Sequence, residues 1–113
     1  MEYLPSINRM AVIVKPKQPF INWIKKQDPN FEMTEEKHDC KNIYLIPEED
    51  GDDWQEYVKK ECVWIFGNQL KDWNTDPHTW PLNRGWNAFN KWFDFEVQTM
   101  IYDLVDDAPV EKD

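Results

Sequence analysis

Glycine is scarce in this sequence, with three residues among 113: Gly51, Gly67 and Gly85. Loops that cradle the phosphates of a nucleotide need several glycines at short, fixed spacing, because the backbone must approach the phosphates closely. None of the three glycines belongs to such a pattern. The common routes to nucleotide binding are therefore excluded.

Cysteine is also rare, and Cys40 and Cys62 are the only thiols. A secreted domain that is held together by disulfides has a denser set. Structural zinc sites draw ligands from pairs roughly two to four residues apart, whereas a single residue separates His38 from Cys40. Cys62 and His78 are isolated. We therefore expect reduced thiols, no metal and no cofactor.

Long apolar runs are missing as well. A membrane-spanning helix needs roughly 18 or more consecutive apolar residues, and the sequence has no such run. Its start, from Met1 to Ser6, lacks the basic and then apolar segments of a secretory signal peptide. These absences predict a soluble, cytoplasmic protein that does not associate with a membrane.

What the sequence has in abundance is tryptophan and acidic residues. Its seven Trp and its 41% of hydrophobic residues are enough to build the core of one domain. The net charge is −9, and after residue 45 sixteen acidic residues stand against six basic ones. A field of this sign repels nucleic-acid backbones, so we expect no nucleic acid as a partner. It favours a basic protein partner, unless the acidic surface serves solubility alone.

Two apolar stretches, residues 10–14 and 43–46, predict buried strands. The first stretch is apolar without alternation, which predicts a strand that is covered on both faces. Helical spacing predicts a short helix over residues 19–27 and a longer one over residues 54–73. The alternation of strand and helix favours parallel pairing of the two strands.

Residues 86–105 fit either one long helix or a short helix followed by a strand. The alternation of apolar and polar side chains after Phe95 favours a helix to about Phe93 and then a third strand to Val105. We therefore predict one α/β (or α+β) domain over residues 1–105, in the order β-α-β-α-(α)-β, with helices packed on a three-stranded sheet. Residues 106–113 are predicted to form an acidic, loosely ordered tail.

The tryptophans fall into two groups. Four lie on the predicted core stripes: Trp23, Trp54, Trp64 and Trp92. The others flank the loop before the last helix, where amphipathic rings line grooves and interfaces, unless they simply cover the core. With neighbouring polar residues and an acidic cluster they form the predicted binding region: Trp73, Trp80, Asn83, Arg84, Trp86, Glu48, Glu49 and Asp50.

Catalysis is the alternative to binding. Nucleophilic or acid–base chemistry could be built from Cys40 or from a histidine beside a carboxylate, but no flanking motif accompanies them. The sequence therefore favours a non-enzymatic binding or protein-interaction domain with an acidic surface, of which an immunity- or antitoxin-like protein is one version. A small cytoplasmic enzyme using Cys40 or a His–carboxylate pair is the second hypothesis.

Two runs near the ends of the chain resemble those of a group of small bacterial proteins. The first is Asn8-Arg9 followed by residues 12–20, VIVKPKQPF. The second is residues 91–97, KWFDFEV, followed by residues 103–105, DLV. The resemblance implies a bacterial origin and implies no activity.

Overall fold

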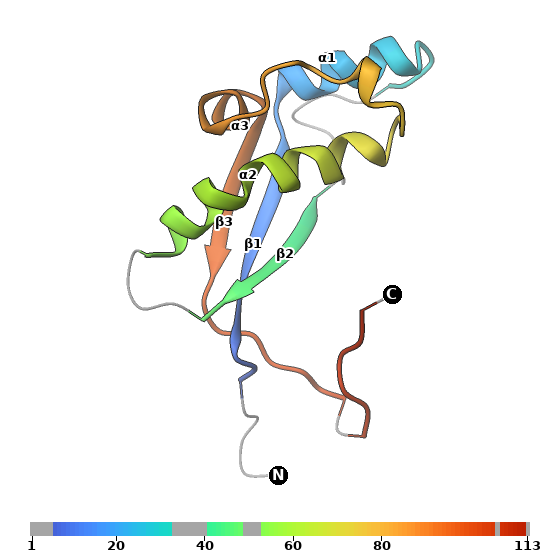
Figure 1. Cartoon of the computed structure of the whole chain (residues 1–113). Coiled ribbons are helices and arrows are strands. Elements are labelled where there is room, and N and C mark those ends of the chain that lie inside the picture. Colours follow the sequence, from blue (N-terminus) through green and yellow to red (C-terminus); the bar gives the residue numbers. More distant parts are fainter. Residues whose placement is uncertain (1–5, 33–40, 49–52, 106, 113) are drawn as a thin grey trace.

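The computed structural model describes residues 6–32, 41–48, 53–105 and 107–112 (Figure 1). The fold is α+β, with one open sheet of three antiparallel strands, and its order of elements confirms the predicted one. The elements are β1 (Arg9–Pro16), α1 (Gln18–Gln27), β2 (Asn42–Pro47), α2 (Asp53–Lys71), the 3₁₀ helix η1 (Pro77–Thr79), α3 (Trp86–Trp92) and β3 (Phe93–Gln98). No helix within these described ranges is both long and apolar enough to cross a membrane.

The central strand of the sheet is β1, which pairs antiparallel with β2 on one side and with β3 on the other. The expected parallel pairing of β1 and β2 is therefore wrong. A parallel pair needs a connection that returns along the length of the strands, so that both strands start at the same end of the sheet. Here α1 lies at the end of the sheet where β1 finishes, and β2 begins there and runs back (Figure 1).

The two faces of the central strand differ. A core cluster contains residues of α2 and α3 together with three alternate residues of β1, which are Met10, Val12 and Val14. No helix of the described residues covers the opposite face, which we call the helix-free face (Figure 1). Ala11 on that face is buried but Ile13 is partly exposed, so the prediction of a strand covered on both faces is only partly correct. The run lacks alternation because Ile13 lies beside the equally apolar Ile43 of β2.

The prediction of a short helix followed by a third strand is confirmed. The last residue of α3 is Trp92, and β3 begins at the next residue, Phe93, without a loop. The strand ends at Gln98, earlier than the predicted Val105. Beyond it the chain stays beside the N-terminal segment, since a hydrogen bond of 2.8 Å joins Ile7 N to Ile101 O.

Three of the four tryptophans that were predicted on core stripes do pack against the core: Trp23, Trp54 and Trp92. Trp64 is 77% exposed, so its assignment to the core is wrong. It belongs to the apolar stretch of α2 between Cys62 and Phe66, where successive side chains point about 100° apart around the helix. Cys62, Ile65 and Phe66 are buried, which leaves Trp64 and Val63 on the outer surface.

Candidate binding site

A hollow of about 500 Å³ lies between the outer surface of α2 and the segment that follows η1. We call it the α2 hollow. Its lining residues are Val63, Trp64, Gly67, Asn68 and Lys71 of α2, with Trp80 and Arg84 of the following segment. Trp80 and Arg84 belong to the predicted binding region, and the structure brings these two together.

Gly67 lines the α2 hollow opposite Trp80. This residue has no side chain, and a Cβ atom at its position would lie 3.7 Å from Cζ3 of Trp80. The Trp80 ring therefore lies against bare helix backbone, and Trp64 lines the same space from one helical turn earlier. A side chain longer than that of alanine would extend into the space between α2 and the Trp80 ring, so the glycine keeps this part of the hollow open.

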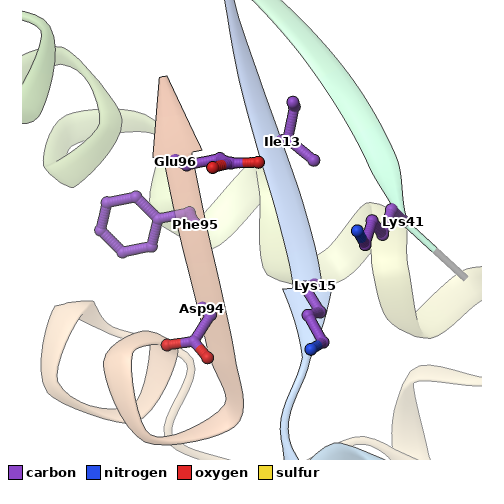
Figure 2. A pocket seen from close by; sticks show the side chains of 6 residues that line it. All are labelled: Ile13, Lys15, Lys41, Asp94, Phe95 and Glu96. Carbon is purple, nitrogen blue, oxygen red and sulfur yellow. The ribbon is translucent and has the colours of Figure 1, made fainter. Parts of the chain in front are cut away.

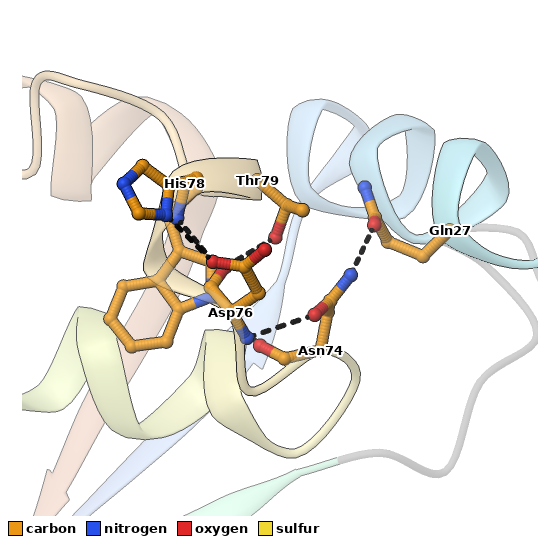
Figure 3. Close-up of polar contacts among 6 residues, drawn as sticks. Gln27, Asn74, Asp76, His78 and Thr79 are labelled. Atoms are coloured by element: carbon orange, nitrogen blue, oxygen red, sulfur yellow. Dashed lines mark hydrogen bonds and ion pairs between the residues drawn. The ribbon is translucent and has the colours of Figure 1, made fainter.

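Hydrogen bonds hold the Trp80 ring in place. Trp80 Nε1 donates to Asn74 O at 2.8 Å. Asn74 is itself fixed, because its Nδ2 donates to Gln27 Oε1 of α1 at 2.9 Å and its Oδ1 accepts from Asp76 N at 2.9 Å (Figure 3). An aromatic wall that is ordered before a ligand arrives loses little conformational entropy on binding.

Both ionisable groups that the described residues contribute to the α2 hollow are cations, although the chain carries a net charge of −9. The guanidinium carbon of Arg84 lies 5.6 Å from the centre of the Trp80 ring, and its Nη1 donates to Pro81 O at 2.8 Å. Lys71 is exposed in the last turn of α2. An anionic group placed in the hollow would therefore meet two positive charges beside aromatic walls.

The exposed residues of the hollow are apolar as well as basic. Trp64 keeps most of its surface in water, and Val63 beside it is 48% exposed. Tryptophan is highly buried on average, so an exposed ring is the more informative of the two. Trp and Arg are also the side chains that most often anchor protein–protein interfaces. The composition of the α2 hollow is therefore typical of a protein-binding surface.

The other two tryptophans of the predicted binding region pack inward. Trp73 is half-buried and lies edge-on against Phe31, with ring centres 4.8 Å apart. Trp86 is half-buried and stacks on Phe89, with ring centres 6.0 Å apart. Both rings pack against the core cluster and neither lines the α2 hollow. Asn83 is exposed, and its Oδ1 accepts a hydrogen bond from the backbone two residues ahead.

Glu48, the described acidic residue of the predicted binding region, does not line the hollow. Glu48 is exposed directly after β2, while Glu49 and Asp50 lie outside the described residues. Sequence reasoning also missed five residues that do line the hollow: Val63, Asn68 and, at helical spacing, Trp64, Gly67 and Lys71. The spacing of three and four residues among the last three places them along one line of a helix, and this was the signal that could have revealed them.

The turn beside Trp80 contains a histidine–carboxylate pair of the kind that the enzyme hypothesis requires. His78 Nδ1 lies 3.0 Å from Asp76 Oδ1, which also accepts the backbone N–H of His78 at 3.0 Å (Figure 3). This carboxylate caps the first turn of η1. The His78 side chain is 96% exposed and lies outside the α2 hollow. The geometry therefore favours a capping role for the pair.

The remaining reactive side chains give no site in the part of the chain that the structure describes. Cys62 is buried in the core, and burial raises the pKa of its thiol, which keeps it protonated and a poor nucleophile. Among the described residues no three His, Cys, Asp or Glu side chains form a group that could hold a metal ion. Cys40 and His38 lie outside those residues, and the absence of a metal stays a prediction.

A polar network beside the hollow attaches β2 to α2. Asn68 Nδ2 donates to Tyr44 Oη at 2.9 Å, and Tyr44 Oη donates to Gln69 Oε1 at 2.5 Å. Asn42 Nδ2 donates to the same Gln69 oxygen at 2.6 Å. Gln69 is buried, so these bonds satisfy a polar side chain inside the core. Burial raises the pKa of Tyr44, and its hydrogen bonds with Asn68 and Asn42 oppose that change.

The free energy of unfolding is expected to fall at alkaline pH because of Tyr44. Its pKa is raised above the usual 10.0 in the folded state, so the unfolded chain loses the phenol proton first as pH rises. The stabilisation is fully present below pH 10.0 and is lost as pH rises through the folded-state pKa. Urea denaturation at a series of pH values should show a shallower alkaline loss for Tyr44→Phe than for the wild type. Tyr102→Phe, at an exposed tyrosine, should keep the wild-type profile; an unchanged profile for Tyr44→Phe would contradict this account.

Comparison of the chain with protein-family models, with curated proteins and with solved structures yields no match in any of the three. The resemblance of its two ends to a group of bacterial proteins therefore stays a prediction. Function is inferred below from the geometry of the chain's own residues.

Proposed function

We propose that this chain is a non-enzymatic protein-interaction domain, and that it binds an apolar, acidic segment of a partner protein in the α2 hollow. The observation that carries the proposal is the exposure of Trp64, at 77%, beside an ordered Trp80 ring and two cations. Burial of an exposed tryptophan against a partner supplies apolar contact, and the cations supply charge-assisted hydrogen bonds to carboxylates.

The size of the hollow supports a peptide segment as the ligand. About 500 Å³ is enough for a few side chains, and the apolar lining of Val63, Trp64 and Trp80 suits an apolar anchor. Lys71 and Arg84 stand at the same surface, so an acidic residue next to the anchor would find a partner. An apolar residue flanked by Asp or Glu is therefore the segment that fits best.

Single-stranded nucleic acid also binds to surfaces of aromatic rings and cations, and the charge of the chain argues against it here. Such binding needs a positively charged groove that follows many phosphates. The α2 hollow offers two cations in a chain of net charge −9, and this field repels an extended phosphate backbone. A short segment with one or two carboxylates experiences far less of this repulsion.

The basic partner predicted for the acidic surface is a separate hypothesis. It concerns Glu48, Glu49 and Asp50, of which only Glu48 is described, and Glu48 is exposed. The immunity- or antitoxin-like version depends on the same residues. The α2 hollow has defined walls, which an acidic surface alone lacks. We therefore prefer the hollow to the acidic surface as the proposed binding site.

Peptide display tests the proposal, with a library of short segments that place Leu, Phe or Trp among Asp and Glu. Trp64→Ala should weaken binding of the selected peptides about 30-fold, which corresponds to the loss of one interface anchor. Lys71→Glu should also weaken binding of these peptides, because the reversed charge repels their carboxylates. The loss of affinity should be larger at lower salt concentration, where charges are screened less. The affinity would be measured by isothermal titration calorimetry at two salt concentrations.

Two control variants make the same chemical changes outside the hollow. Leu82→Ala removes another exposed apolar side chain, and Lys59→Glu reverses another exposed charge on α2. Both should bind the selected peptides as the wild type does. The proposal fails if no acidic, apolar peptide is selected, or if the controls weaken binding as much as Trp64→Ala and Lys71→Glu do.

A further inference from the structure

An edge strand of the sheet has no described partner on its outer side. The strand order is β2-β1-β3, and β2 pairs only with β1 among the described residues. The outer edge of such a strand presents backbone N–H and C=O groups that another strand can pair with. Beside this edge, toward α2, lies a hollow of about 260 Å³ whose lining includes Tyr44 and Tyr57.

The two edges of the sheet differ in charge. On β3, Asp94 and Glu96 lie on the helix-free face, and charged residues on an edge strand discourage pairing with another chain (Figure 2). The β2 strand carries no charged residue between Asn42 and Pro47. An uncharged edge strand is therefore the available pairing site, and β3 is not.

The apolar side chains of β2 are exposed where a folded monomer would be expected to place polar ones. Ile43 and Leu45 lie on the helix-free face and are 63% and 49% exposed. In an antiparallel sheet with one face in water, the outward residues are normally polar. Ile43 and Leu45 thus form an apolar strip that reaches the unpaired edge.

We propose that β2 is the interface between two copies of this chain, paired antiparallel about a twofold axis at Tyr44 to form one six-stranded sheet. In this register Ile43 of each copy lies opposite the partner subunit's Leu45, on the helix-free face. Such cross-strand apolar pairs stabilise a sheet, and here they occur twice by symmetry. Both exposed apolar residues of β2 would find a neighbour in the same contact.

Charge complementarity selects a second copy with this orientation. Lys41 precedes β2 and Glu48 follows it, and both are exposed. Antiparallel pairing about Tyr44 places Lys41 opposite the partner subunit's Pro47 and one residue from its Glu48, so a cation and a carboxylate lie near each other at both ends of the paired strands. A parallel arrangement would instead place Lys41 beside the partner's Lys41. The charges at the two ends of β2 therefore match those of an inverted copy of the same strand.

The first test measures the oligomeric state of the full chain by sedimentation equilibrium over low to high micromolar concentration. The wild type should approach a mass twice that of the 13.7 kDa chain. Leu45→Lys should weaken association at least tenfold, because it places a charge on the pairing strand. Leu82→Lys makes the same change at an exposed leucine outside the sheet and should leave association unchanged. A wild type that stays monomeric throughout, or a Leu45→Lys variant that associates normally, would overturn the proposal.

The second test examines the register through the charged ends of β2. Lys41→Glu should weaken association several-fold, because it places two carboxylates near each other at each end of the paired strands. The double variant Lys41→Glu/Glu48→Lys restores opposite charges and should return association to the wild-type level. If the double variant associates no better than Lys41→Glu, or if β2 pairs with a strand of a different protein in solution, the twofold pairing is wrong.

Discussion

Val12→Asp is expected to unfold the protein, whereas Ile13→Asp, one residue further along β1, is expected to leave it folded. Val12 is fully buried in the core cluster between the sheet and the helices. An aspartate at this position would place a carboxylate in an apolar environment without a cation. The cost of a buried, unpaired charge is at least several kcal/mol, against a total stability of about 5–15 kcal/mol for a domain.

Ile13 lies on the helix-free face, where a carboxylate stays hydrated. Its cross-strand neighbours are Ile43 of β2 and Glu96 of β3. Aspartate is a poor strand former and would repel Glu96, so a loss of about 1–2 kcal/mol is expected. Ile13→Lys, which places a cation opposite Glu96, should lose less. Circular dichroism and urea denaturation of the three variants measure these differences.

The outcome that contradicts this account is an equal effect at the two positions. If Ile13→Asp unfolds the protein as Val12→Asp does, β1 is covered on both faces in solution. Near-wild-type stability of Val12→Asp would instead remove this strand from the core. Either result would change which face of the sheet is available to a partner.

The contrast between Val12 and Ile13 shows what an apolar run can predict. Residues 10–14 indicate the existence and position of β1 correctly. They do not indicate how many faces are covered, because the pattern records side-chain type and not what lies above each side chain. Ile13 is apolar because it lies beside Ile43 of β2, and that pairing joins residues far apart in the sequence.

The direction of strand pairing depends on contacts that no local pattern contains. The ring of Phe20 in α1 lies 4.9 Å from the ring of Phe93, centre to centre, and Lys17 N donates to Trp92 O at 2.8 Å. These contacts hold α1 against the end of the sheet, at the junction of α3 and β3. The chain therefore re-enters the sheet at the end where it left, and β2 runs antiparallel to β1.

The candidate site was only partly predictable, because it too depends on contacts between residues far apart in the sequence. Trp73, Trp80 and Trp86 all flank the same loop, so their sequence positions suggest equal roles. In the structure Trp73 and Trp86 find the rings of Phe31 and Phe89, while Trp80 lies over Gly67 and leaves a hollow. Which ring meets a partner ring and which meets a glycine is decided by tertiary packing, and the sequence lists only the candidates.

Phe66→Ala is expected to lower the free energy of unfolding by about 3–5 kcal/mol, the usual cost of removing a fully buried phenylalanine. Phe66 is completely buried on α2, and its ring centre lies 5.1 Å from that of Phe93 and 5.3 Å from that of Trp92. It therefore joins α2 to the junction of α3 and β3. Alanine would leave a cavity at this junction, because the surrounding rings cannot close it without moving the strand.

Trp64→Ala is the matched control, because it removes a larger ring from the same helix two residues earlier. Trp64 is mostly exposed, so its loss should change the free energy of unfolding by less than about 0.5 kcal/mol. Thermal denaturation should show a melting temperature lower by about 12 °C or more for Phe66→Ala and nearly unchanged for Trp64→Ala. A large loss for Trp64→Ala would place its ring in the core and remove the exposed anchor of the α2 hollow. A small loss for Phe66→Ala would mean that α2 is held on the sheet by other contacts, such as the Tyr44–Gln69 hydrogen bond.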